Sequence, residues 1–333
     1  MTLEPQILDQ PPAVSGGPAA GPVGRSPAAL AWRRLRRDRV GVVSGLVVLV
    51  FFLAGLGAPV ISALYGKDPY TTYGQNQPGL LDDYGYPIGP GGGMSGQYWL
   101  GLEPGLGRDV FMQLIYGIRT SLLIALAVVV IITVLGTLLG VIAGFAGGVL
   151  DFSIGRVIDI VLCFPSTLFA IAFVPVAQTL FVSPTEQTPA WVRAATLIGV
   201  LSAFGWAGVA RLLRGQTLSL RTREFVEAAR LAGAGPARIV LRELLPNLWA
   251  PILLSASMAV PGYVTAEAAL SFLGAGMEEP TPDWGRMIQH GAEVYSADFT
   301  YMLIPGLAML IFVLAFNLFG DAVRDALDPK NAR

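Results

Sequence analysis

The sequence has one cysteine and one histidine, and this scarcity excludes several kinds of site. Cys163 lies inside an apolar run, so neither a disulfide framework nor a cysteine-based metal site can form. With His290 as the sole histidine, a multi-histidine site within the chain is excluded as well. Charged residues make up 14% of the 333 residues, against roughly a quarter in a typical soluble domain. The chain therefore has too few polar residues to cover a soluble fold of this size.

Lysine is nearly absent too. The two lysines are Lys67 and Lys330, and neither stands between a glycine-rich turn and a Ser or Thr. A P-loop lysine, which contacts the β- and γ-phosphates of a nucleotide, is therefore impossible in this chain. We expect the chain to have no catalytic residue, no cofactor and no metal, and not to hydrolyse ATP itself.

Apolar residues are abundant and make up 53% of the chain. They form runs close to the roughly 20 residues that a helix needs to cross a hydrocarbon core. A β-barrel would show short alternating segments instead. We predict an all-α integral membrane protein with six transmembrane helices, at residues 40–64, 120–144, 157–181, 194–210, 244–266 and 299–320.

Basic residues are distributed unevenly about these runs. With the N-terminus inside, 17 of the 22 Lys and Arg residues fall on the inner side, so the positive-inside rule predicts that both termini are cytoplasmic.

Residues 40–64 form too long a run for a cleaved signal peptide and would be an uncleaved signal anchor. The other predicted segments are a largely disordered N-terminal segment with a basic cluster (1–39), an external segment (65–118), a core (119–322) with a cytoplasmic loop (211–245), and a cytoplasmic tail (323–333).

The second apolar run carries Gly136, Gly140 and Gly144 at a spacing of four, which places all three on one helix face. Small residues let another helix approach closely inside a membrane, so this spacing predicts a packing seam within or between subunits. Glycines scattered by chance through an apolar helix are the alternative.

Two acidic residues lie near the ends of apolar runs. Asp159 follows Arg156 by three residues, and an ion pair between them would explain both. Glu267, near the outer end of the fifth run, has no partner close in sequence. It is either a polar contact or gate residue at the outer mouth, or a solvated carboxylate at a helix end.

The loop between the fourth and fifth runs is the most informative stretch. The sequence predicts a short helix at residues 223–232 with Thr222 as its N-cap. Gly233 or Gly235 would end this helix, and a second short helix at 237–244 would lead into the fifth span.

The first of these short helices is too polar to enter the membrane and too small to be a domain. Its predicted apolar face consists of small residues and one aromatic: Phe225, Ala228, Ala229 and Ala232. A lipid-bound amphipathic helix would normally present bulkier side chains than alanine. The composition therefore favours docking into a groove of a partner protein.

Several stretches resemble a known family. Glu227-Ala228-Ala229, Gly233 and Leu245-Pro246 resemble the EAA motif of ABC importer permeases. Further similar stretches lie at 32–61, 98–101, 106–111, 114–117, 267–276, 281–285 and 314–329, so that the resemblance covers about residues 30–330. They are similar to the C-type permease subunits of dipeptide and oligopeptide importers. Residues 67–96, 101–105 and 183–191 depart from the family pattern, all on the predicted outer side.

The resemblance implies the type I ABC importer permease fold, with a five-helix core and an additional N-terminal helix, in the bacterial inner membrane. It implies that the cytoplasmic loop holds a coupling helix that contacts an ATPase, through Glu227, Ala228, Ala229, Gly233, Leu245 and Pro246. The implied partners are a second permease subunit, two ATP-binding subunits that hold ATP and Mg²⁺, an extracytoplasmic substrate-binding protein and the lipid bilayer, but no nucleic acid. The implied substrate is a di- or oligopeptide, with nickel complexes and oligosaccharides as alternatives.

Two other classes of membrane protein are weighed against this one. A secondary transporter would show inverted repeats and ionisable residues near the midplane, and the sequence shows neither clearly. A membrane-embedded enzyme would need a nucleophile with its base, or paired acids, at membrane depth, whereas His290 lies in a predicted outer loop.

Overall fold

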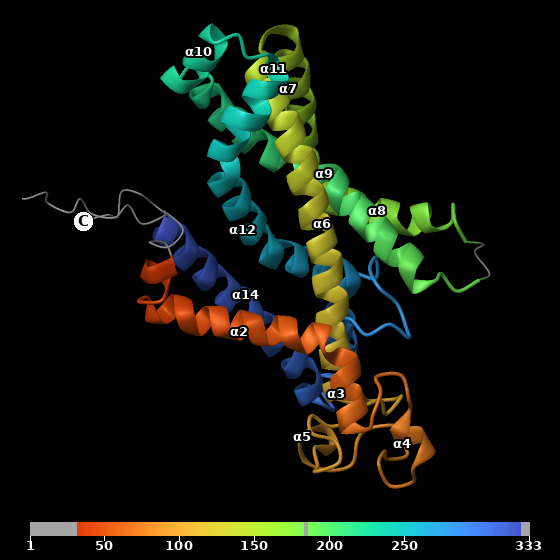
Figure 1. The fold of residues 1–333 in the computed structure, drawn as a ribbon. Coiled ribbons are helices and arrows are strands. Elements are labelled where there is room, and N and C mark those ends of the chain that lie inside the picture. The colour runs from red at the N-terminus through yellow and green to blue at the C-terminus, as the bar shows by residue number, and fades with distance from the viewer. Residues whose placement is uncertain (1–31, 183–185, 328–333) are drawn as a thin grey trace, which may run out of the picture.

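A computed structural model describes residues 32–182 and 186–327 of the chain (Figure 1). These residues form helices joined by turns and irregular segments, which confirms the predicted all-α class. The predicted disorder of the first 30 residues, residues 183–185 of the outer segment 183–191, and the end of the predicted tail from residue 328 lie outside the described residues.

Long apolar helices form the body of the molecule: α2 (Arg39–Leu56), α6 (Val110–Ala146), α9 (Ala190–Leu220), α12 (Leu245–Phe272) and α14 (Phe299–Leu327). Within residues 32–182 and 186–327, five helical stretches are long and apolar enough to cross a membrane. The bent pair α7 (Gly148–Cys163) and α8 (Ser166–Gln178) brings the number to six if it counts as one span. Counted in this way, the number agrees with the six spans of the sequence prediction.

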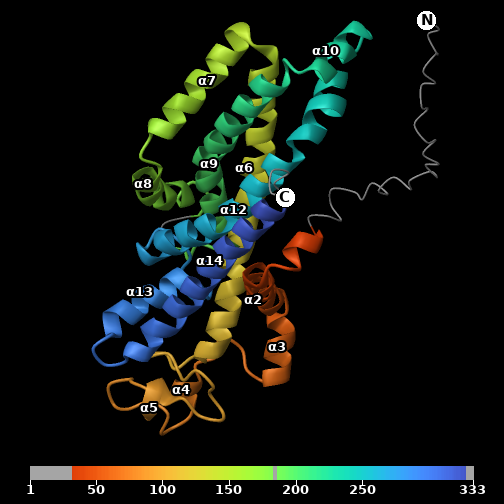
Figure 2. The same cartoon turned by 90° about the vertical axis from the view of Figure 1, so that its left-hand side faces the viewer.

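Shorter helices gather mostly at the two ends of the molecule: α3 (Ala58–Tyr65), α4 (Tyr73–Asn76), α5 (Pro90–Gly93), α10 (Glu224–Leu231), α11 (Pro236–Arg238), the π-helix η1 (Ile239–Leu244) and α13 (Trp284–Val294). Helices α10 and α11 lie at one end, called here the α10 end, and α4 and α5 lie at the opposite end, called the α5 end (Figures 1 and 2). Helix α6 extends between the two ends.

The first predicted span, 40–64, is divided at Gly57 into α2 and α3. Pro59 stands in the first turn of α3, where its missing N–H does no harm, but it could not continue α2 without breaking a hydrogen bond. The second span begins at Val110 rather than at residue 120, because the carboxylate of Asp109 caps it by accepting a hydrogen bond from the N–H of Met112 at 2.8 Å. A hydropathy run misses these first turns, which contain polar residues.

The third predicted span, 157–181, is wrong as a single helix. Helices α7 and α8 meet at a bend of 83°, with Phe164 and Pro165 between them. Phe164 is extended, with φ −78° and ψ 134°, which is the conformation that a following proline imposes.

Two other helices end later than predicted. Helix α9 continues to Leu220, into the predicted loop 211–245, and α14 continues to Leu327, into the predicted tail 323–333.

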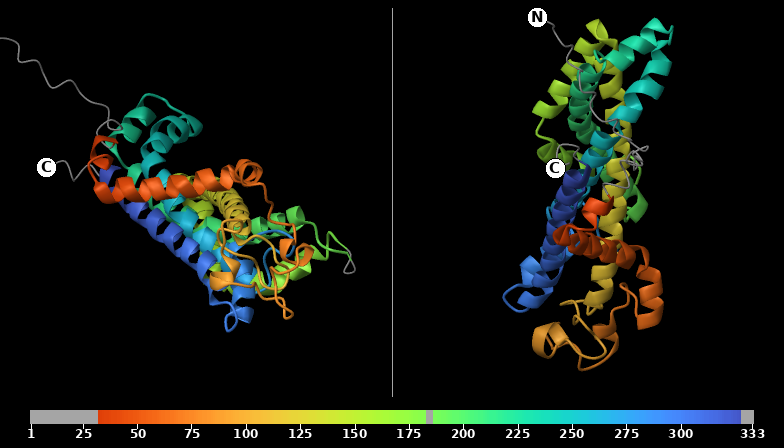
Figure 3. Two further views of the ribbon diagram at one scale, coloured as in Figure 1. Left: turned by 90° about the horizontal axis from the view of Figure 1, so that it is seen from below. Right: turned by 60° about the vertical axis from the view of Figure 1, so that its left-hand side comes forward.

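An aromatic cluster joins α2, α13 and α14. The ring of Phe51 lies edge-on to those of Trp284 and Phe312, with centroid distances of 5.9 and 5.4 Å. The indole N–H of Trp284 also donates to the carbonyl of Leu114 on α6 at 3.2 Å. Helix α2 accordingly lies along α14 (Figure 3), and its other side leaves bulky apolar residues exposed, Val43, Leu46, Val50 and Leu53. Such a face suits contact with lipid.

Candidate functional site

Helix α10 is anchored to the rest of the chain by a few apolar side chains. Val226 is fully buried and packs in one cluster with Ile239 and Leu244 of the π-helix η1. Half-buried Phe225 and Ala229 pack against the same cluster. Because η1 continues directly into α12, a displacement of α10 would act on the start of a membrane-spanning helix.

The opposite side of α10 is exposed. Glu227 and Ala228 are exposed while Ala229 is half-buried, so the predicted small-residue face is divided between the two sides of the helix. Leu231 lies one turn after Glu227 and is 88% exposed, the highest value for a bulky apolar side chain in the described ranges. Sequence analysis did not select Leu231, although an isolated leucine after a run of small and charged residues was a visible signal.

Two backbone hydrogen bonds close the C-terminal end of α10. The N–H of Gly233 donates to the carbonyl of Arg230 at 2.9 Å, and the N–H of Ala234 donates to that of Ala229 at 3.0 Å. This pairing requires a left-handed residue, and Gly233 has φ +79°. Gly235, the other predicted stop, has an ordinary φ of −70°. The helix therefore ends where Gly233 was predicted to end it.

The start of α10 differs from the prediction. Thr222 does not cap the helix; the N-cap residue is Arg223, and no side chain caps the first turn. The hydroxyl of Thr222 donates instead to the carbonyl of Ser219 at 3.3 Å. A threonine hydroxyl can bond back to its preceding turn as readily as forward to the next one, and here the end of α9 supplies the acceptor.

The predicted second short helix, 237–244, is not a separate element. Helices α11 and η1 run without a break into α12 as one span from Pro236 to Phe272. The π-helical turns come just before Pro246, whose missing N–H leaves a carbonyl of the preceding turn without its α-helical partner. Leu245 is half-buried in a cluster with Leu248 inside the molecule, and Pro246 is exposed, so neither extends the exposed face of α10.

One side of α6 carries a glycine at every fourth residue and faces α9: Gly136, Gly140 and Gly144. A Cβ atom at Gly140 would lie 2.5 Å from the carbonyl oxygen of Ala210, and one at Gly144 would lie 2.7 Å from the Cβ of Thr217. These distances are far below van der Waals contact, so glycine allows the two helices to approach at these positions. The seam lies within this chain.

Ion pairs join α7 to α9 near the α10 end. The predicted pair of Arg156 with Asp159 has a separation of 3.8 Å, but Asp159 lies closer to Arg211 of α9, at 2.5 Å. Asp151 binds Arg214 through two contacts of 2.5 and 3.0 Å. Sequence analysis missed both pairs across the two helices, because the partners are more than 50 residues apart and no local spacing connects them.

Glu267 lies in a buried polar cluster where α12 meets α13. Glu267 and Asp283 are both fully buried, and the hydroxyl of Ser271 lies 3.1 Å from a carboxylate oxygen of each. The other oxygen of Glu267 has no hydrogen-bond partner within the described ranges, and nor does the nearby hydroxyl of Ser121 on α6. The solvated alternative for Glu267 is therefore wrong.

A second buried cluster lies toward the α5 end, around Glu103. Its carboxylate accepts hydrogen bonds from Arg108 at 2.5 and 2.8 Å and from Gln113 at 2.7 Å. The hydroxyl of Tyr301 on α14 lies 3.1 Å away, and the ring of His290 on α13 lies 3.2 Å away. One buried carboxylate thus holds the segment before α6 against both α13 and α14.

Electrostatics keep this cluster ionised. Burial alone would raise the pKa of the Glu103 carboxyl, but hydrogen bonds from His290 and Arg108 and the charge of Arg108 lower that pKa to about 2. Arg108 also pairs with Glu279 at 2.8 Å, and Glu279 pairs with Arg286 at 2.6 Å. Within residues 32–182 and 186–327, no three metal-ligating side chains gather into a metal site. The pairs of Glu279 with Arg108 and Arg286 join the segment before α6 to α13.

Sequence comparisons agree on one family. Residues 136–333 match the family described as "Binding-protein-dependent transport system inner membrane component", and residues 26–82 match the "N-terminal TM domain of oligopeptide transport permease C". The chain is 34% identical to the dipeptide transport system permease protein DppC of Alkalihalophilus pseudofirmus, over 92% of this chain and 90% of that protein. It is 35% identical to the glutathione transport system permease protein GsiD of Escherichia coli, over 90% and 89% of the two chains.

A comparison of folds gives the same class. The structure is similar to a chain in a set of inward-facing structures of the MetNI methionine ABC transporter, with a TM-score of 0.50 and 22% sequence identity. The likeness covers 65% of this chain and 97% of that chain, so it shows a shared fold of the type I importer permeases. Together with the sequence matches, it shows that the chain belongs to the family of inner-membrane components of binding-protein-dependent transport systems, the multi-pass permease subunits of ABC importers.

Proposed function

We propose that the chain carries di- or oligopeptides across the inner membrane. The support is the naming of its relatives, which transport dipeptides and glutathione, itself a short peptide. Nickel complexes and oligosaccharides are the alternative substrates. In this proposal the chain pairs with a second permease subunit, two separate subunits bind ATP and Mg²⁺, and an extracytoplasmic binding protein delivers the peptide.

Helix α10 would be the element that contacts an ATPase subunit. The observation that carries this assignment is the two-sided character of α10: Val226 is fully buried against η1, whereas Glu227 and Leu231 are exposed. An exposed apolar side chain beside a carboxylate, on a helix tied to a membrane span, suits a partner that both binds and moves it. Alternating access would then follow from ATP-driven movement of α10 acting on α12.

In the same proposal the α10 end is cytoplasmic, as are both termini, and the α5 end is extracytoplasmic. The positive-inside distribution supports this orientation, since the exposed arginines around α10 belong to the inner set.

Glu267 would then lie toward the outer side. Its burial against Asp283 supports a role in holding α12 to α13 at the outer mouth, as part of an outer gate.

One pair of cysteine variants tests both the orientation and the contact. After Cys163→Ser removes the native thiol, Leu231→Cys and Tyr84→Cys each place a thiol at a highly exposed position, at opposite ends. In intact cells, a membrane-impermeant maleimide should label the Tyr84 variant and not the Leu231 variant. In inverted vesicles, a short bifunctional reagent should link the Leu231 variant to the ATPase subunit. Labelling in the reverse pattern would refute the orientation, and linkage only through the Tyr84 variant would refute the contact.

The substrate is tested separately, in liposomes that contain the complete transporter and its binding protein. Uptake of a labelled dipeptide should depend on ATP and should be reduced by unlabelled peptides. Uptake that responds only to a nickel complex or an oligosaccharide would replace the peptide proposal with one of its alternatives.

A further inference from the structure

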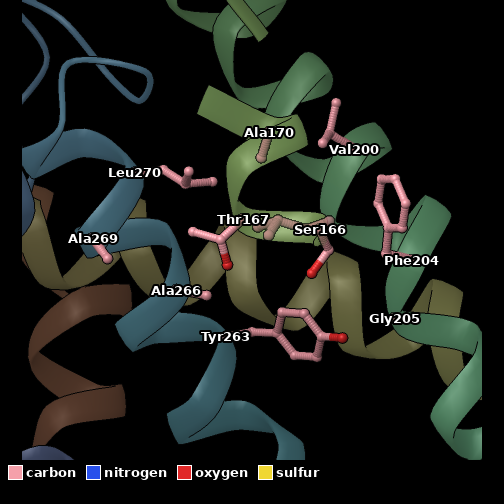
Figure 4. Close-up of a pocket in the computed structure, with 11 residues that line it drawn as sticks. Ser166, Thr167, Ala170, Val200, Phe204, Gly205, Tyr263, Ala266, Ala269 and Leu270 are labelled. Atoms are coloured by element: carbon pink, nitrogen blue, oxygen red, sulfur yellow. The ribbon is translucent and has the colours of Figure 1, made fainter. Parts of the chain in front are cut away.

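An open cavity lies at the bend between α7 and α8, lined by residues of α8, α9 and α12 (Figure 4). Its volume is about 240 Å³, smaller than the roughly 300–1,000 Å³ of pockets that enclose a whole drug-sized ligand. Its walls are mostly small or apolar, and none of the lining residues is charged. Three hydroxyl groups interrupt this apolar lining, those of Ser166, Thr167 and Tyr263.

These three hydroxyls have no hydrogen-bond partner among the described residues, whereas others on α12 do. Ser255 and Thr265 on α12 each donate to the carbonyl of a residue in the preceding turn, both at 2.9 Å. Ser166 and Thr167 stand in the first turn of α8, and the bend at Pro165 turns the preceding helix away from them. The same break that bends the span therefore leaves two hydroxyls free to face the cavity.

The place of the third hydroxyl depends on a glycine. A Cβ atom at Gly205 of α9 would lie 2.0 Å from the Tyr263 oxygen, so no other residue fits there while Tyr263 keeps its position. Figure 4 shows the Tyr263 ring extending from α12 toward Gly205, on the same side of the cavity as Ser166. Two elements, α8 and α12, thus bring uncharged donor and acceptor groups to one small space, and Gly205 of α9 leaves room for them.

Ser166 and Thr167 are exposed and Tyr263 is half-buried, so all three hydroxyls are accessible to a ligand, and a group that displaces water from them must supply hydrogen bonds of its own. We propose that this cavity contacts the substrate in transit and that its three hydroxyls hydrogen-bond to the backbone amide groups of a peptide. Uncharged hydroxyls can both donate to a carbonyl and accept from an N–H, which is what an amide offers. The cavity has no charged group for a peptide terminus and no carboxylate, imidazole or thiol ligand for a nickel ion.

This inference rests on the proposed peptide substrate, and uptake by the complete transporter in liposomes tests it. Tyr263→Phe and the double variant Ser166→Ala/Thr167→Val remove hydroxyls with little change in shape. Each lost hydrogen bond should slow uptake of labelled trialanine about two- to tenfold. ATP hydrolysis stimulated by the loaded binding protein should stay at the parental level, because the ATPase contact is distant. Gly205→Val, which displaces the Tyr263 hydroxyl, should slow uptake as well.

Thr265→Val is the matched control, because its hydroxyl bonds to its own helix, and it should transport normally. Recognition of the backbone also predicts the same fold-loss for peptides with different side chains. Parental uptake rates in Tyr263→Phe and in the double variant would overturn this inference alone. A parental transporter that takes up no peptide would overturn the proposed substrate first, and this inference with it.

Discussion

The buried charged cluster near the α5 end and the charged residues of α10 are used in opposite ways. At the α5 end, Glu103, Arg108 and Glu279 contact one another or close neighbours, and Glu103 is fully buried. At the α10 end, Glu227 and Arg223 are exposed and take part in no ion pair among the described residues. The first set is satisfied by the chain itself, whereas the second is left for water or for a partner.

This contrast separates residues that hold the fold from residues that serve an interface. A buried charge that loses its partner destabilises a protein strongly, while an exposed one contributes little to stability. The α10 end is nevertheless attached firmly, through the buried Val226 and the α6–α9 glycine seam. Packing therefore holds α10 itself, and the charges of Arg223 and Glu227 remain available. The following substitutions test this division, from the largest expected effect to the smallest.

The largest loss of stability should follow from Glu103→Ala. Removal of the carboxylate leaves Arg108 with one fewer partner in a buried site and also removes acceptors for Gln113 and Tyr301. We expect a loss of about 3–5 kcal/mol in the free energy of unfolding, measured by thermal unfolding of the purified transporter. Exposed Asp83→Ala, in the same segment, is the control and should change stability by less than about 0.5 kcal/mol. Equal unfolding temperatures for the two variants would contradict the structural role of the cluster.

The same cluster gives a pH dependence with a definite sign. The folded-state pKa of Glu103, about 2, lies below its ordinary value of 4.5, so its ionisation stabilises the fold above about pH 4.5. This contribution disappears as the pH falls toward 2. The difference in unfolding temperature between the parent and Glu103→Gln should therefore be large near neutral pH and shrink at about pH 3. A difference that grows on acidification would show that Glu103 is not held ionised.

Gly140→Leu should have the next largest effect. Any side chain at this position meets the backbone of Ala210, and overpacking of this kind costs about 1–3 kcal/mol. Because the seam lies within the chain, stability should fall even before any partner is considered. Gly208→Leu, on the exposed side of α9 where an added Cβ meets nothing, is the matched control. Loss of complex assembly without loss of subunit stability would move the seam to a contact between subunits.

The sequence predicted the helical class, the end of α10 at Gly233 and the glycine seam, because each depends on a local property: run length, a turn residue or a four-residue spacing. It failed where tertiary structure decides. The partner of Asp159 is Arg211 on another helix, and the partners of Glu103 come from α6, α13 and α14. The bend at Pro165 is an intermediate case, since the proline was visible but the apolar run hid the break that it causes.

Leu231 and Glu267 show the same limit from two sides. Whether a residue is buried depends on which elements pack over it, and the sequence gives only the residue type. No pattern in the sequence singled out Leu231, which is 88% exposed, and the sequence left open whether Glu267, which is fully buried, is solvated. In both cases burial, and not secondary structure, is what the residue type left undetermined.

A smaller and local effect is expected at the end of α10. Gly233→Val places a β-branched residue at φ +79°, at a cost of about 1–2 kcal/mol for the left-handed conformation. Gly235→Val is a close control, because its φ of −70° accommodates any residue and, as at Gly233, an added Cβ meets nothing. Hydrogen exchange of α10 should accelerate in the first variant only, and ATP-driven uptake should fall with it. Equal exchange in both would show that the left-handed turn does not fix α10.

The smallest effect on stability, and the sharpest separation of the two ends, should come from Glu227→Arg. Glu227 is exposed and has no ion pair within the described ranges, so reversal of its charge should change the free energy of unfolding by less than about 0.5 kcal/mol. If α10 contacts the ATPase, the same change should weaken binding of that subunit and reduce ATP hydrolysis stimulated by the binding protein.

Gln77→Arg is the control. Gln77 is exposed near the α5 end, so the substitution adds a positive charge without touching α10 and should leave ATPase binding unchanged. A stable Glu227→Arg protein that binds the ATPase and transports at the parental rate would place the contact elsewhere. The exposed charges of α10 would then be no more than a solvated surface, and the contrast between the two ends would lose its functional meaning.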